Sequence, residues 1–126
     1  MRKYLFGAVF SVGLLLFGLA GCSRSGSQPP PPLAVEQIPT EMNKAFAKAP
    51  ADVKDVVNQL NTTLGAKDYV AASQAIQTLF NLPVATKDQR MVTVRSMLTI
   101  NSLLQTAQAQ GDQKAAAVLS EQRRLK

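Results

Sequence analysis

Residues 86–110 read TKDQRMVTVRSMLTINSLLQTAQAQ, the longest helical pattern after the N-terminal segment. Thr86 and Gln89 match a capping box, which is typical of a helix start, and Gly111 ends the pattern. A helix that is apolar over most of its girth is usually buried between neighbouring helices. We therefore predict that a helix at about residues 87–110 forms the centre of the fold. Its apolar residues fit no single narrow stripe, and they are Met91, Val92, Val94, Met97, Leu98, Ile100, Leu103 and Leu104.

Shorter amphipathic segments lie on both sides of this helix. Apolar residues recur at three- and four-residue spacing in residues 40–49, 51–64 and 68–80, where Phe80 completes a stripe, and more sparsely in residues 112–123. No stretch shows the convincing alternation of a β-strand. We predict an all-α fold of four or five short helices, which form antiparallel helical hairpins around the long central helix. The last helix should be the loosest element, because it carries few large apolar residues.

Particular residues set the expected helix ends. Thr40 is a candidate N-cap for the first helix, and Pro50 should end that helix. Gly65 stands where a C-terminal glycine is expected after the second helix. Asp68 and Asp112 are each expected to cap the helix that follows a tight turn.

An internal echo at an offset of 44 residues relates residues 53–80 to residues 97–123. The identical pairs include Leu60 and Leu104, Thr62 and Thr106, Asp68 and Asp112, Ala71 and Ala115, and Ala72 and Ala116. Both copies read as a helix, a tight turn, an Asp cap and an Ala-rich helix. This pattern faintly resembles the middle of a tetratricopeptide-type hairpin, in which a small residue lies where the two helices cross. The resemblance implies stacked helical hairpins, although that family repeats at about 34 residues.

The first 22 residues have the three parts of an export signal. Arg2 and Lys3 form a basic start, residues 4–17 are almost entirely apolar, and small residues follow. Residues 19–22, Leu19-Ala20-Gly21-Cys22, resemble the lipobox of bacterial lipoproteins at all four positions. The resemblance implies that the thiol of Cys22 receives a diacylglycerol, that a peptidase cuts before Cys22, and that the new amine is acylated. Ser23, in place of an Asp, favours the periplasmic face of the outer membrane over the inner membrane.

A Ser-, Gly- and Pro-rich stretch follows Cys22. Residues 23–32 read SRSGSQPPPP, which favours a polyproline II path without a packed core. We predict three parts: a signal peptide at 1–21, a lipidated Cys with a disordered tether at 22–38, and a small helical domain at 39–126. An extended tether of this length would lift the domain about 40–50 Å from the lipid. The alternative is that residues 29–32 bind a proline-recognition groove.

The composition argues against catalysis. The chain of 126 residues contains no His and only one Cys, so neither a Ser-His-Asp site nor a Cys-rich zinc site can form within it. Of its eight acidic residues, the five Asp residues read as helix caps or first-turn residues, and no phosphate-binding loop or metal-spaced cluster is present. We expect no cofactor, no metal and no small-molecule substrate. The net charge of +6 is not by itself a nucleic-acid signature, and we expect no nucleic-acid partner.

Few residues remain as candidates for binding. Arg123, Arg124 and Lys126 could contact anionic lipid or envelope polymers, although cations are favoured at any helix C-terminus. Met91 could line an adaptable groove, and Tyr69 could bind a ligand, but we expect both to pack in the core. We predict a lipid-anchored cell-envelope protein that acts as a non-catalytic binding, adaptor or structural module. Its partners would be the membrane, through the acyl chains on Cys22, and an unknown envelope protein or a second copy of the chain.

Overall fold

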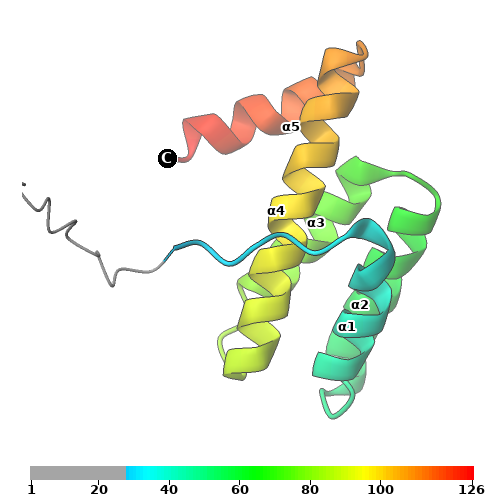
Figure 1. Ribbon diagram of the computed structural model, residues 1–126, viewed down its shortest axis with the longest axis vertical. Coiled ribbons are helices and arrows are strands. Elements are labelled where there is room, and N and C mark those ends of the chain that lie inside the picture. The colour runs from blue at the N-terminus through cyan, green and yellow to red at the C-terminus, as the bar shows by residue number, and fades with distance from the viewer. Residues whose placement is uncertain (1–27) are drawn as a thin grey trace, which may run out of the picture.

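The computed structural model describes residues 28–126 (Figure 1). This part of the chain contains one 3-10 helix and five α-helices and no strand, so the predicted all-α fold is confirmed. The elements are η1 (Val35–Gln37), α1 (Ile38–Ala45), α2 (Ala51–Gly65), α3 (Tyr69–Phe80), α4 (Lys87–Ala109) and α5 (Gln113–Arg124). The expected signal peptide, the lipobox with Cys22, and the beginning of the expected tether lie outside the described residues.

Helix α4 is the central element, as predicted. It is 23 residues long and begins with the expected capping box, in which Thr86 and Gln89 bond to each other's backbone N–H groups at 3.1 and 3.0 Å. It packs against α1, α3 and α5, while α2 packs against α1 and α3 (Figure 1). Ile100 and Leu104 on α4 are fully buried among residues from these helices. The core therefore lies between α4 and the α1–α2–α3 layer.

The buried face of α4 contains more polar residues than the apolar pattern of its sequence predicted. Three hydroxyl residues, Thr93, Ser96 and Thr99, are buried, whereas Met91 and Leu98 are exposed. A helix that is apolar on most sides can bury only the sides that neighbours cover. Of the three hydroxyls, only that of Thr99 bonds to the irregular backbone that covers α4, whereas Thr93 donates to the Gln89 carbonyl of its own helix and Ser96 has no partner among the described atoms.

The 44-residue echo corresponds to two turns with the same hydrogen bonds, one between α2 and α3 and one between α4 and α5. After α2 the Asp68 N–H donates to the Thr63 carbonyl at 2.9 Å, and after α4 the Asp112 N–H donates to the Ala107 carbonyl at 3.0 Å. Each Asp side chain then accepts from the backbone N–H three residues later, on Ala71 and Ala115, at 3.1 Å. The Asp caps are confirmed, and buried Ala72 and Ala115 let each following helix approach closely.

One residue before each Asp takes the left-handed backbone conformation. In the second turn this residue is Gly111, with φ of +95°, and in the first it is Lys67, with φ of +58°. The sequence placed Gly65 just after the second helix; Gly65 is instead the last residue of α2, Ala66 is the cap, and the left-handed residue is Lys67. The first turn therefore places a side chain in a conformation that glycine adopts at lower cost.

The first helix begins and ends earlier than predicted. It starts at Ile38, so Thr40 lies inside its first turn and does not cap it. It ends at Ala45, and Pro50 is the N-cap of α2 rather than the end of α1. Because Pro39 lies in the first turn, where a backbone N–H has no helical partner, a helix can start there without a side-chain cap.

The predicted boundary at residue 38 was also wrong. Leu33 is 4% exposed, Ile38 is fully buried, and both belong to the core. We call residues 30–37 the N-terminal strap, because they cross α4 before α1 begins (Figure 1). The proline run favours extension, as predicted, but the apolar side chains that follow it bind the strap to the helical domain.

Two further expectations concern the outer elements. Phe80 ends α3 with 55% of its surface exposed, so it is not the core residue that its stripe suggested. Helix α5 leaves α4 at a wide angle and projects from the bundle (Figure 1), and only Ala115 and Leu119 on it are buried. This agrees with the expectation of a loosely held last helix.

Candidate functional site

Three contacts hold the N-terminal strap to the middle of α4. Arg95 Nε donates to the Pro31 carbonyl at 2.8 Å, and the Leu33 N–H donates to the Arg95 carbonyl at 3.4 Å. The Thr99 hydroxyl donates to the carbonyl of Leu33 in a buried contact. The path of the chain toward Cys22 is therefore fixed to the central helix as far as Pro31.

A groove of about 480 Å³ opens where this path meets the start of α4. Apolar surface comes from Pro30, Ala85, Met91 and Val94, and two basic residues, Lys87 and Arg90, complete the lining. Met91 is 43% exposed, so the expectation that it fills the core was wrong. We call these six residues the basic groove, because no acidic side chain lines it.

Exposed apolar and basic residues lie at and beside the basic groove. Val84, just before Ala85 in the chain, is 89% exposed, and Lys87 and Arg90 are both exposed. The Arg90 Nε donates to the Ala85 carbonyl at 3.3 Å, which holds the base of this guanidinium at the groove edge. The arrangement places exposed apolar carbon beside two cations, which suits an amphipathic, anionic partner.

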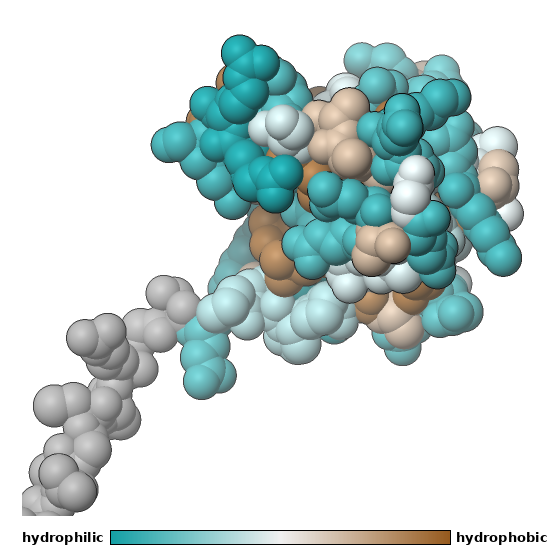
Figure 2. Space-filling model, turned by 90° about the horizontal axis from the view of Figure 1, so that it is seen from above, coloured by the Kyte–Doolittle hydropathy of each residue, from teal (hydrophilic) through white to brown (hydrophobic). Residues whose placement is uncertain are grey.

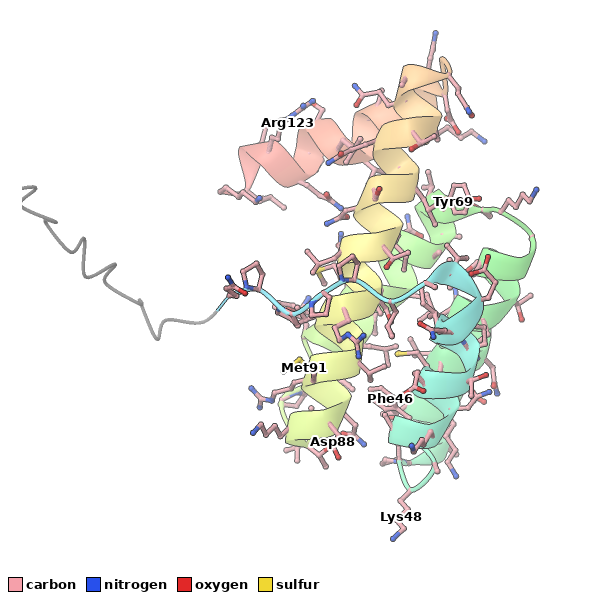
Figure 3. All side chains as sticks on the ribbon, viewed as in Figure 1. Phe46, Lys48, Tyr69, Asp88, Met91 and Arg123 are labelled. Atoms are coloured by element: carbon pink, nitrogen blue, oxygen red, sulfur yellow. The ribbon has the colours of Figure 1, made fainter. Side chains whose placement is uncertain are left out.

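A second hollow of about 370 Å³ lies between α1 and the start of α4. Its charged lining residues are of both signs, with Glu41 and Lys44 on α1 and Asp88 and Arg95 on α4. Figure 3 shows Asp88 and Met91 on the first turns of α4, and Phe46 at the end of α1. Opposite charges in one shallow hollow offset each other, so this site favours neither an anion nor a cation.

The predicted basic end lies on the last turn of α5 and its tail. Arg123, Arg124 and Lys126 are all exposed, and Figure 3 shows Arg123 near the free end of the helix. Arg124 approaches Glu121 at 3.4 Å, but both side chains are mostly exposed, so the pair contributes about 0–1 kcal/mol. Arg123 and Lys126 also line a hollow of about 220 Å³ between α4 and α5, which they share with Asn101, Gln105, Gln108, Leu119 and Gln122. In Figure 2, α5 is a mainly hydrophilic projection.

The remaining candidates have structural roles. Tyr69 is half-buried and packs against the core, as expected. Asp52 and Asp88 lie in first helical turns, and Asp68 and Asp112 cap helices. Within residues 28–126, no three acidic or Cys side chains are grouped so that they could hold a metal ion. No helix in the same residues is long and apolar enough to span a bilayer.

The strap and the basic groove were missed at the sequence level. The signal that could have revealed the strap is the series Leu33, Val35 and Ile38, which follows the proline run directly and is too apolar for a solvated tether. The groove left no comparable signal, because Pro30 and Val94 are far apart in the chain and meet only through the fold.

Comparisons with other proteins do not assign the chain to a family. No protein-family model, no curated protein and no solved structure matches the chain. The resemblances to bacterial lipoproteins and to tetratricopeptide hairpins therefore rest on their motifs alone.

Proposed function

We propose that the protein is a bacterial lipoprotein, held at the membrane by acyl chains on Cys22 and acting as a non-catalytic binding or adaptor module. The observation that carries this proposal is the sequence Leu19-Ala20-Gly21-Cys22 directly after a basic start and an apolar run. The only Cys of the chain stands at the one position where lipidation needs it. Ser23 supports the outer membrane as the destination.

The helical domain would carry the binding role. Residues 28–126 form a core around α4, and six of their eight acidic residues are helix caps or first-turn residues, the exceptions being Asp55 and Glu121. Several large apolar side chains remain exposed, among them Phe80, Leu98 and Leu125. These features support recognition of an envelope protein, or of a second copy, over turnover of a substrate. Chemical crosslinking in the native envelope, followed by mass spectrometry, would identify what the domain contacts.

Replacement of Cys22 tests the anchor. Cys22→Ser removes the sulfur that the glyceryl group requires, so metabolic labelling with palmitate should disappear and the protein should leave the membrane fraction. Ser23→Ala, one residue away, should keep the label. Unchanged labelling of Cys22→Ser, or an unmodified N-terminus in the native protein, would contradict the proposal.

A second candidate function rests on the cations of α5. Because Arg123, Arg124 and Lys126 are all exposed, they could bind anionic headgroups or envelope polymers. Added salt separates this candidate from apolar pairing, because exposed charges are screened within about 8–10 Å at physiological ionic strength. Binding that survives high salt would favour the protein partner.

A further inference from the structure

The strap fixes how far the helical domain can stand from its anchor. Eight residue steps separate Cys22 from Pro30, which lines the basic groove. A fully extended chain spans at most about 3.3–3.6 Å per residue, so these steps cover no more than about 29 Å. The height of about 40–50 Å expected for a tether through residue 38 is therefore excluded for the groove, because the last part of that tether is bound to α4.

We propose that the basic groove lies against the anionic phospholipid surface of the membrane that holds Cys22. This inference rests on the proposed lipid anchor and names the surface that the anchored domain presents to the bilayer. The chain enters the fold at Pro30, beside the groove, so the groove is the part of the domain that the anchor holds nearest along the chain. No other described hollow contains a residue from the chain segment that leads to Cys22.

The chemistry of the groove matches a phospholipid interface. Lys87 and Arg90 can donate to phosphate oxygens, while Met91 and Val94 offer apolar surface to the region just below the headgroups. Glu41 and Asp88 line the hollow between α1 and α4 and not the groove, so no carboxylate within it opposes an anion. Each basic side chain near an anionic membrane favours contact about fivefold, so the two together favour it about 30-fold.

Contact through this groove would orient the domain. The described chain leaves α4 toward the side opposite α1 and α2 (Figure 1), and α2 packs only against α1 and α3 among its main neighbours. With the groove on the lipid, α2 faces away from the bilayer. The exposed surface of α2 then stays available to a protein partner.

The test uses the mature protein as isolated from the bacterial envelope, reconstituted into vesicles of phosphatidylcholine alone or mixed with anionic phosphatidylglycerol. An environment-sensitive fluorophore is attached at Met91→Cys in the groove, or at Thr62→Cys on exposed α2 as the control. Acylated Cys22 does not react with the label. On anionic vesicles we expect the probe at 91 to shift to the blue and to be protected from acrylamide quenching, whereas the probe at 62 stays exposed.

Charge variants then test the source of the contact. Replacement of Lys87 and Arg90 by Gln should lower the ratio of protected to exposed probe about 30-fold, because two attractive charges are lost. Replacement of Lys48 and Lys54 by Gln removes the same charge from exposed positions outside the groove and should leave the ratio unchanged.

The possible outcomes distinguish a failure of the proposed groove contact from a failure of the proposed lipid anchor. Protein that does not float with any vesicle would overturn the lipid anchor. Protein that floats but shows equal quenching at positions 91 and 62 would overturn the groove contact and leave the anchor intact. Equal protection at position 91 on neutral vesicles, or protection in detergent alone, would also overturn it, since an uncharged surface or a second copy would then cover the groove.

Discussion

Leu33→Ala tests whether the N-terminal strap belongs to the folded domain. Leu33 is 4% exposed, its side chain joins the core cluster, and its backbone bonds to α4 on both sides. The substitution keeps the backbone and removes only buried carbon. If residues 22–38 were a solvated tether, this change would have no effect on stability.

The expected loss follows from the carbon removed. Leu→Ala deletes three carbon atoms, and at about 0.8 kcal/mol for each buried CH₂ the transfer term is about 2.4 kcal/mol. A residual cavity raises such losses to about 2–5 kcal/mol. The strap lies near the end of the described chain and can shift to close part of the void. We therefore expect Leu33→Ala to lower the free energy of unfolding by about 2–3 kcal/mol.

Urea and thermal unfolding, followed by circular dichroism of the α-helix signal, would measure this loss. For a domain of this size the melting temperature should fall by about 8–24 °C. Pro32→Ala is the matched control, because Pro32 is the exposed neighbour and its replacement should stay within about 0.5 kcal/mol. A Leu33→Ala protein as stable as the control would return the domain boundary to residue 38 and remove the chain-length limit on the groove.

Two further substitutions should stabilise the protein. Ser96 is fully buried and its Oγ has no hydrogen-bond partner among the described atoms, so Ser96→Ala should raise the free energy of unfolding by about 1–2 kcal/mol. Ser102→Ala on the exposed side of α4 should gain only the helix-propensity difference of about 0.5 kcal/mol, and an equal gain at both positions would contradict a cost at Ser96. Lys67→Gly relieves a positive φ and should add about 1 kcal/mol, whereas Lys54→Gly, at an exposed position within α2, should lose about as much in the same urea titration. A destabilised Lys67→Gly would show that the first turn carries no strain.

The helices could be predicted from sequence because their signals are local. Periodicity located α2, α3, α4 and α5 to within a few residues, and Asp68, Thr86 and Asp112 marked helix starts through hydrogen bonds that span only three residues. The central role of α4 was also predictable, since its apolar residues require several neighbours. The repeated turn was visible as the 44-residue echo, although its left-handed position was not.

The strap and the groove could not be predicted in the same way. Their contacts join Pro31 and Leu33 to Arg95 and Thr99, which are more than 60 residues apart in sequence. The periodicity of the strap and of α4 does not indicate that these two segments contact each other. The proline run correctly indicated an extended path, but extension alone does not determine whether a segment lies in water or on a helix.

The polar face of α4 and the composition of the strap explain each other. Proline has no backbone N–H, so a Pro-rich segment offers carbonyl acceptors with few donors and cannot bind its neighbour as a β-strand would. Where such a segment lies on a helix, its carbonyls need donors from side chains, because the helix has already used its own N–H groups. Arg95 and Thr99 supply these donors to Pro31 and Leu33. An all-Leu face on α4 would leave the buried Leu33 carbonyl without a partner, at a cost of about 1–3 kcal/mol, whereas the exposed Pro31 carbonyl could still bond to water. The hydroxyl and guanidinium groups that make α4 a poorer apolar helix are thus what allow it to hold the strap, and with it the chain that leads to Cys22.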